Sequence, residues 1–319
     1  MKDRIAVIDL GTNTFHLFIV ELDGRKVNTL YKEKIAVKIG KNGISKGKIA
    51  ADAFKRAIHT LKVFRTVIDL FEVTDIKGVA TSAIRSAKNG GELIQEIKDK
   101  TDIDIQIISG NEEAELIFRG VEAAMELPET PQLVMDIGGG SVEFIIGTNR
   151  EILWRHSFEI GAQRLLDQFH QTDPIPEQSV LELRKFLASE LQALTTAIEE
   201  YKPVGLIGCS GTFDTLKEIY LKREKLEEAT NSTVFELPAI HYEQIHQELL
   251  LKDRAARLQI PGMITLRADM IVVACCLIHF VIEKLHCQSI TACAYALKEG
   301  LLFSRVGQDK EVANRPTSK

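Results

Sequence analysis

Apolar and polar positions along the chain follow alternating and helical periods that predict strands and helices in two similar halves. In the first half we expect strands at 5–10, 14–22, 27–37, 76–80 and 103–109, a loop at 81–91, and helices at 52–71, 92–99 and 110–127. In the second half we expect strands at 133–136, 141–147, 151–159, 204–208 and 289–294. Helices are expected there at about 176–200, from about 212, at 241–257, at 264–286 and from about 295. Each half is therefore predicted to be a β-meander followed by α/β units.

This order of elements predicts an α/β protein with two domains. A chain of 319 residues is long enough for two domains of ordinary size. We expect an N-terminal domain over 1–128, joined by a C-terminal helix at about 295–310, and a second domain over 129–294. The two domains are expected to enclose a cleft. The polar tail at 311–319 is expected to be disordered.

Two of the predicted hairpin turns share an order of residues: an acid, an apolar residue, a glycine and then small residues. Glycine permits close approach to the backbone, and consecutive N–H groups can form a nest for an anion. An aspartate would repel that anion unless a divalent cation lies between them. The shared order suggests an internal duplication, and two such hairpins could hold a phosphate chain from both sides. The residues are Asp9 with Gly11, Thr12, Asn13 and Thr14, and Asp136 with Gly138, Gly139, Gly140 and Ser141.

Composition and charge limit the partners and the compartment. The net charge of −5 gives no general attraction to nucleic acid or to an anionic membrane, so an anionic ligand must be held by local groups or a metal. The apolar stretch at 270–282 is too short to span a bilayer comfortably. We expect it to be a buried core helix, although it could also serve a homodimer interface. Five cysteines without a CxxC pair, and no leading signal segment, favour buried thiols in a cytoplasmic protein.

Six stretches together resemble one known family. They are "IDLGTNTFHLFIV", "ATSAIRSAKN", "ISGNEEAELIFRGV", "VMDIGGGSVEFIIG", "GCSGTF" and "ALKEGLL". In this order they are similar to the exopolyphosphatase/guanosine pentaphosphatase (Ppx/GppA) family of the actin-like ATPase superfamily. The resemblance implies two actin-like (ribonuclease H-like) domains. It also implies hydrolysis of a terminal phosphoanhydride with Mg²⁺ or Mn²⁺.

The resemblance assigns roles to individual residues. Glu113 is implied to be the base that deprotonates water, although its spacing alone would suggest an acid that complements a helix dipole. Asp9 and Asp136 are expected to be metal ligands, with a further role near the metal for Glu143. The role of Glu112 stays open, and Asn111 is expected to cap the helix. Phosphate contacts are expected from Arg85 and from the helix-opening stretch at Gly208, Ser210, Gly211 and Thr212.

Four functions stay open on the sequence alone. The resemblance implies an exopolyphosphatase acting on inorganic polyphosphate or an enzyme that converts guanosine pentaphosphate to tetraphosphate. An actin-like kinase or ATPase would use the same residues for ATP. A sensor would bind polyphosphate or the guanosine nucleotide without turnover. Longer relatives carry an extra helical domain that extends the binding channel, so the chain-length preference and the processivity of this chain stay open.

Overall fold

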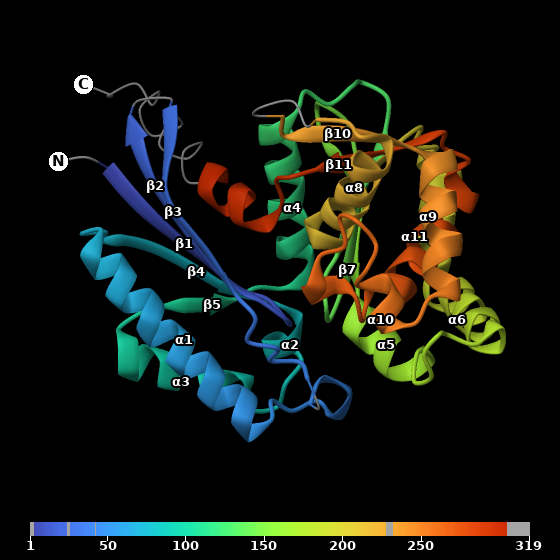
Figure 1. Ribbon diagram of the computed structural model, residues 1–319. Coiled ribbons are helices and arrows are strands. Elements are labelled where there is room, and N and C mark those ends of the chain that lie inside the picture. The colour runs from blue at the N-terminus through green and yellow to red at the C-terminus, as the bar shows by residue number, and fades with distance from the viewer. Residues whose placement is uncertain (1–2, 24–25, 42, 228–231, 305–319) are drawn as a thin grey trace. The chain divides into compact units, whose positions relative to one another are not determined.

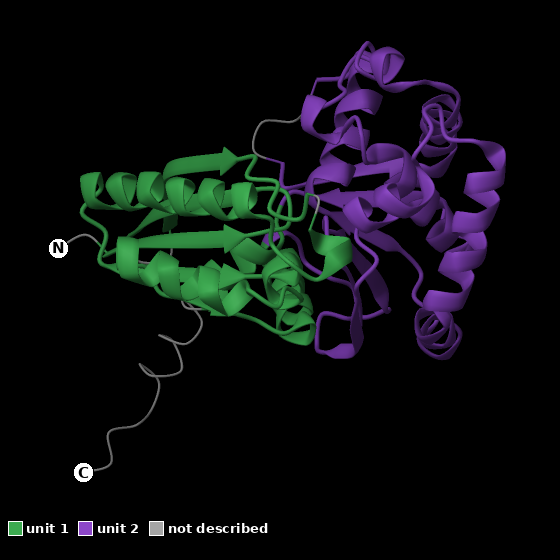
Figure 2. Ribbon diagram, turned by 90° about the horizontal axis from the view of Figure 1, so that it is seen from below, with its two compact units in different colours: residues 1–123, 295–319 green, residues 124–294 purple. Residues whose placement is uncertain are grey.

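The computed structural model describes residues 3–23, 26–41, 43–227 and 232–304. Its contacts divide the chain into two compact units, coloured separately in Figure 2. Unit 1 consists of Met1–Ala123 and Tyr295–Lys319, and unit 2 consists of Ala124–Ala294. Unit 2 is thus one continuous segment, whereas unit 1 is completed by residues that follow unit 2. The tail predicted to be disordered, at 311–319, lies outside the described residues.

Unit 1 is built around a mixed β-sheet (Figure 1). Its described strands are β1 (Asp3–Leu10), β2 (Phe15–Asp23), β3 (Lys26–Ile35), β4 (Asp75–Ala80) and β5 (Ile105–Ile107). Its helices are the 3-10 turn η1 (Ile44–Lys46), α1 (Ala51–Leu70), α2 (Ser82–Arg85), α3 (Gly90–Thr101), α4 (Gly110–Ala124) and a last helix at 297–304. The sheet order is β3-β2-β1-β4-β5, with β1 to β3 antiparallel and β4 and β5 parallel to β1.

Both faces of strand β1 are buried, and alternate residues face different partners. Figure 1 shows α1 and α3 along one face of the sheet, where Ile8 and Leu10 join a cluster with Leu61 and Phe64 of α1. Ile5 and Val7 point to the opposite face and pack in a cluster that includes Leu302. The run that precedes Asp9 is therefore apolar on both faces because helices cover both, as is usual for strands with parallel neighbours.

Unit 2 contains a second mixed sheet with helices packed against it. Its strands are β6 (Gln132–Ile137), β7 (Val142–Gly147), β8 (Ile152–Phe158), β9 (Leu206–Cys209), β10 (Val234–Pro238) and β11 (Ser289–Cys293). Its helices are α5 (Ala162–Phe169), α6 (Glu177–Glu190), α7 (Gln192–Tyr201), α8 (Ser210–Glu224), α9 (Ala239–Leu251), α10 (Arg254–Arg257), η2 (Thr265–Arg267) and α11 (Ile271–Leu285). The sheet order is β10-β11-β9-β6-β7-β8.

The two sheets repeat one topology. When the extra edge strand β10 is set aside, the order β8-β7-β6-β9-β11 matches β3-β2-β1-β4-β5 strand for strand. In both sheets the first three strands are antiparallel, and the next two run parallel to the first of them. The predicted fold class, α/β with two actin-like domains, is confirmed, and the repeated topology supports the suggested duplication.

Several predicted element boundaries were wrong. The helix expected at 176–200 is two helices, because the chain bends at Leu191 (φ −96°, ψ 24°). Leu191 and its neighbours Leu187 and Leu194 are all buried, so the bend lets both helices reach the core. The helix expected at 241–257 breaks at Lys252, and the side chain of Asp253 then caps the short α10 by accepting from Ala256 N–H at 2.8 Å.

Further differences concern short elements. The helix expected at 264–286 begins only at Ile271, because an extended Ile264 and the 3-10 turn η2 come first. The loop expected at 81–91 contains the one-turn helix α2. Helix α5 and strand β10 were not predicted at all. All these elements are short or lack the periodicity on which the predictions depended.

The apolar stretch at 270–282 forms most of α11, and its side chains are buried in the unit 2 core, as expected. Among the described residues, no helix is both long enough and apolar enough to cross a membrane. The five cysteines are free thiols, of which Cys209, Cys275, Cys276 and Cys293 are buried, as predicted.

Candidate functional site

In unit 1 the predicted site residues follow the carboxyl ends of three neighbouring strands. Strand β1 pairs in parallel with β4, and β4 pairs in parallel with β5. Asp9 is the penultimate residue of β1, Arg85 ends helix α2 just after β4, and Glu113 lies in the first turn of α4 just after β5. In α/β sheets, ligands bind outside the carboxyl ends of the strands.

Backbone hydrogen bonds fix the turn between β1 and β2, both within the turn and to the loop after β3. Gly11 N–H donates to Thr14 C=O at 3.1 Å, which closes the turn. The carbonyls of Thr12 and Asn13 accept from Gly40 N–H at 3.0 Å and from Lys38 N–H at 2.9 Å. Thr12, Asn13 and Thr14 are buried despite being polar. The carbonyls of Thr12, Asn13 and Thr14 are thus occupied, so the turn would bind a ligand through hydroxyl and amide groups.

Arg85 and Glu113 form an ion pair. Arg85 Nη1 lies 2.8 Å from Glu113 Oε2 and also donates to Ile108 C=O at 3.2 Å. The Glu113 side chain is 9% exposed and that of Arg85 is 19% exposed. A guanidinium next to a carboxylate favours the charged form of that carboxylate, and a charged carboxylate can accept a proton. The two residues lie on different helices, so only the fold brings them together.

Glu112 has a structural contact that its neighbour lacks. Its Oε2 accepts from Ser109 N–H at 2.7 Å, and its own N–H donates to Ser109 Oγ at 3.2 Å. This reciprocal pair is a capping box, and it lowers the pKa of the exposed Glu112 through the hydrogen bonds from Ser109. The predicted cap Asn111 was wrong, because Asn111 already lies inside α4.

In unit 2 the register places two acids opposite each other. Asp136 of β6 pairs with Glu143 of β7, so their side chains share one face of the sheet. Asp136 is 6% exposed and Glu143 is 2% exposed. Glu143 Oε1 also accepts from Ser157 Oγ of β8 at 2.6 Å. Asp136 and Glu143 therefore form a pair of buried, adjacent carboxylates.

The glycine turn between β6 and β7 is clamped by helix α5. Gly138 N–H donates to Ser141 C=O at 3.0 Å, which repeats the closure of the unit 1 turn. The carbonyls of Gly138, Gly139 and Gly140 accept from the N–H groups of Ala162, Gln163 and Gly161 at 2.9–3.0 Å. Within the described residues, the N–H groups of Gly139 and Gly140 make no hydrogen bond. These two N–H groups are available to an anion.

The stretch at 208–212 joins strand β9 to helix α8 beside this turn. β9 pairs in parallel with β6, and Cys209 lies opposite Asp136. Ser210 opens α8 with a φ of 70°, an uncommon value for a residue other than glycine. Gly208 leaves room for the Phe213 ring, which a Cβ would meet at 2.1 Å. The first-turn N–H groups of Gly211 and Thr212 can therefore bind an anion with the helix dipole.

Two arginines of unit 2 were not predicted. Arg267 lies against Gly211, where a Cβ would come within 2.3 Å of its Nη2. Burial lowers the pKa of Arg267, and the nearby Asp214 and Asp136 partly oppose that shift. Arg164 Nε donates to Gly140 C=O at 2.8 Å and thereby supports the turn. Neither arginine stands in a recognisable local motif, so no signal in the sequence could have found them.

The donor chemistry of Asp136 and Glu143 fits the expected metal. Two buried carboxylates on one face repel each other unless a proton or a cation is shared between them. Oxygen-only donors with one or two carboxylates suit Mg²⁺ or Mn²⁺, which retain several waters. Asp9 offers a further carboxylate in unit 1. Thr14 Oγ1 of the turn that follows lies 3.0 Å from His16 Nε2 of β2.

The comparisons with known proteins define the class of protein: a phosphatase with a two-unit α/β fold. Residues 18–309 match the Ppx/GppA phosphatase family, and the chain belongs to this family. The protein is therefore a hydrolase of phosphoanhydrides, as predicted.

Two solved structures illustrate the similarity. An exopolyphosphatase from Cytophaga hutchinsonii is 46% identical and covers 96% of this chain and 98% of its own, with a TM-score of 0.93. A Ppx/GppA family member from Aquifex aeolicus is 25% identical and covers 97% of this chain and 99% of its own, with a TM-score of 0.81. The similarity thus extends over both units.

Proposed function

We propose that this protein is an exopolyphosphatase that hydrolyses the terminal phosphoanhydride of inorganic polyphosphate, with Glu113 as the base. The observation that carries the proposal is the buried Glu113 carboxylate, which is ion-paired with Arg85 at the carboxyl ends of β4 and β5. The 46% identity to an exopolyphosphatase supports the choice of substrate. Hydrolysis of guanosine pentaphosphate is the second activity to be tested.

The groups of unit 1 would activate water. The terminal phosphoryl group of the substrate competes for the Arg85 guanidinium, which now binds Glu113 Oε2 at 2.8 Å. Glu113 then accepts the proton of a water whose oxygen attacks the terminal phosphorus. The bond from that phosphorus to the bridging oxygen breaks, so that phosphate and a chain one phosphate shorter leave. The in-line water, the proton acceptor and neutralised charge are what this reaction requires.

Unit 2 has phosphate-binding groups of its own. The N–H groups of Gly139 and Gly140, the hydroxyl of Ser141 and the start of α8 offer hydrogen bonds to phosphate oxygens. Arg267 adds positive charge next to Gly211. Asp136 and Glu143 would hold Mg²⁺ or Mn²⁺, which when bound would neutralise charge on the phosphoryl oxygens. Because the carboxylates sit in the sheet, their position does not depend on a loop.

The test of the base compares two neighbouring glutamates. Glu113→Gln should lower phosphate release by about 10²- to 10⁴-fold, because amides do not accept the proton. Glu112→Gln is the matched control, since Glu112 caps α4 through Ser109 and makes no contact with Arg85. The measurement is kcat for release of phosphate from polyphosphate with Mg²⁺. Equal losses in both variants would assign the base elsewhere.

The test of the substrate uses four compounds in parallel: short polyphosphate, long polyphosphate, guanosine pentaphosphate and ATP. The proposal expects the highest kcat/KM for polyphosphate. Higher values for the guanosine nucleotide would move the assignment to the second activity, and ATP turnover would favour the kinase or ATPase function. Tight polyphosphate binding without turnover would identify a sensor. A homodimer stays a prediction, for which sedimentation provides the measurement.

A further inference from the structure

A cluster of histidines and carboxylates lies between α9 and α11 of unit 2. Figure 1 shows the two helices side by side, and Tyr242 Oη of α9 donates to Cys275 C=O of α11 at 2.6 Å. Glu243 and His246 lie one turn apart on α9, and His279 faces them from α11. None of these residues belongs to the phosphohydrolase groups described above.

His246 is a buried polar side chain that lacks a hydrogen-bond partner among the described residues. It is 3% exposed, and neither ring nitrogen forms a hydrogen bond within the described residues. A buried imidazole that makes no hydrogen bond is costly and calls for an explanation. Burial, and secondarily the neighbouring His279, lowers the pKa of His246 to about 4.

The potential ligand atoms of these three residues lie close together. Glu243 Oε2 lies 3.1 Å from His279 Nδ1 and 4.0 Å from His246 Nδ1. Despite its 3.1 Å distance, His279 Nδ1 makes no hydrogen bond, because the atoms are not aligned for one. One ligand atom from each of the three residues lies within 4.8 Å of the others. Ligands of a tetrahedral zinc ion, at 2.0–2.1 Å from it, stand roughly 3.3 Å apart.

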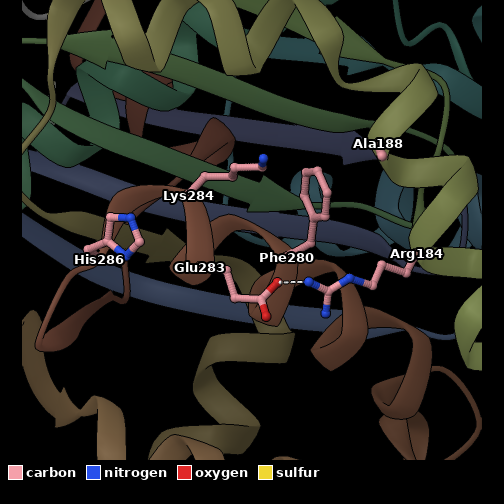
Figure 3. A pocket seen from close by; sticks show the side chains of 6 residues that line it. All are labelled: Arg184, Ala188, Phe280, Glu283, Lys284 and His286. Carbon is pink, nitrogen blue, oxygen red and sulfur yellow. Dashed lines mark ion pairs between the residues drawn. The ribbon is translucent and has the colours of Figure 1, made fainter.

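Neighbouring side chains that are not themselves ligands, here called the outer groups, orient these ligands. Gln247 Nε2 donates to the other oxygen of Glu243 at 2.7 Å, which leaves Oε2 directed at the histidines. His279 Nε2 lies 3.5 Å from Glu283 Oε1, and Glu283 Oε2 lies 2.8 Å from Arg184 Nη2 of α6. Figure 3 shows this last ion pair in a surface pocket beside Phe280. Histidines that bind metals commonly have such a carboxylate on the second nitrogen.

We propose that Glu243, His246 and His279 bind a zinc ion between α9 and α11. Two imidazoles and one carboxylate are a recurrent zinc set, and a water completes the four ligands. The set differs in kind from the oxygen-only pair Asp136 and Glu143, which suits magnesium. The ligands come from two helices that only folding brings together, so the ion binds the folded state of unit 2 and stabilises it.

The test measures zinc binding by the full chain in excess Mg²⁺, which occupies the carboxylate-only site. Calorimetry of the metal-free protein should show one Zn²⁺ per chain, and Co²⁺ in its place should give the visible absorption of a tetrahedral complex. His279→Gln and Glu243→Gln should each weaken binding by more than the roughly 10- to 100-fold expected for the outer-group variant Glu283→Gln. His279 and Glu243 are half-buried, so these variants avoid the fully buried His246.

His241→Gln is the control, because His241 also lies on α9 but pairs with Glu224 outside the cluster. It should bind Zn²⁺ as the unaltered protein does. Circular dichroism without metal shows whether each variant is folded. The proposal is overturned if the unaltered protein binds no Zn²⁺ under these conditions. It is also overturned if His279→Gln and Glu243→Gln bind as tightly as His241→Gln.

Discussion

The hairpin of unit 1 and the hairpin of unit 2 share a backbone but differ in what faces the aspartate. Both turns close with the same hydrogen bond, Gly11 N–H to Thr14 C=O and Gly138 N–H to Ser141 C=O. Across the strand pair, Asp9 stands opposite His16, whereas Asp136 stands opposite Glu143. A single carboxylate beside an imidazole can hydrogen-bond a ligand, whereas two carboxylates call for a cation. The comparison teaches that one repeated turn can serve two kinds of chemistry.

The largest effect is expected from removing the aspartate of each hairpin in turn. Asp136→Asn should lower kcat/KM by about 10³-fold, because it removes one of two paired metal ligands. It should also raise the Mg²⁺ concentration needed for half-maximal activity. Asp9→Asn should cost only about 10- to 100-fold and shift the Mg²⁺ dependence less. Equal losses and equal Mg²⁺ shifts would show that the two hairpins are not specialised.

The next largest effect, on the free energy of unfolding, is expected at the glycine that packs against each turn. A Cβ on Gly161 would lie 2.5 Å from backbone atoms of Gly139 and Gly140. A Cβ on Gly40 would lie 2.5 Å from the Thr12 methyl, and its other neighbours, atoms of Ile44, lie at an ordinary contact distance of 3.5 Å or more. Gly161→Ala should lower the free energy of unfolding by about 1–3 kcal/mol, because the backbone cannot move aside cheaply. Gly40→Ala should cost less, since Thr12 can rotate. Urea denaturation of both variants makes the measurement, and the reverse order would contradict this account.

A smaller effect on stability is expected from the capping of the helices next to the two hairpins, which differs between the units. Helix α4 of unit 1 is capped by the side chain of Ser109, whereas α5 of unit 2 donates its first N–H groups to the carbonyls of the glycine turn. Ser109→Ala should cost about 1 kcal/mol of unfolding free energy. Ser109→Asp is the control, because aspartate is an equally good cap. If the alanine variant is as stable as the aspartate variant, the capping box contributes nothing.

The smallest effect is a difference in pH dependence between the units. Burial lowers the pKa of His170 in unit 2 below 6.5, so the unfolded state takes up the proton first and stability falls as pH drops below 6.5. Partial desolvation raises the pKa of the exposed Glu122 in unit 1 above 4.5, so the folded state takes up that proton first and gains stability as pH falls.

Hydrogen exchange of amides in each unit, measured from pH 7 to pH 5, compares these slopes. As the pH falls, amides of unit 2 should become less protected from exchange relative to those of unit 1. The change in unfolding free energy with pH should not exceed the slope that uptake of one proton produces. His170→Gln should remove the unit 2 slope. A slope unchanged by that substitution would assign the effect to another group.

Local patterns predicted the hairpins well because their chemistry lies within a few adjacent residues. The turns at 11–14 and 138–141 could be placed from composition alone, and the register then set Asp136 against Glu143. The spacing of Ser109 and Glu112, three residues apart, also fits a capping box. The prediction named Asn111 instead, because asparagine is a common capping residue. The family resemblance, and no spacing, pointed to Glu113.

What could not be predicted depends on contacts between distant segments. The Arg85–Glu113 ion pair joins two helices that only the β4–β5 pairing brings together. Arg267 reaches Gly211 from a separate part of unit 2, and no motif surrounds it. No proline or glycine near Leu191 indicates the bend in the sequence. The bend results from the burial of residues on both sides of it.

The split composition of unit 1 has a consequence for the nascent protein on the ribosome. Unit 2 is a continuous segment, so all of it has been translated before the helix at 297–304 exists. Until then, Ile5 and Val7 lack the partner Leu302, and Gly120 lacks the neighbouring backbone of Ala296. We expect the released chain 1–294 to resist protease over 124–294 while its first 123 residues are cut. Synthesis of the last helix would then be the event that makes the enzyme whole.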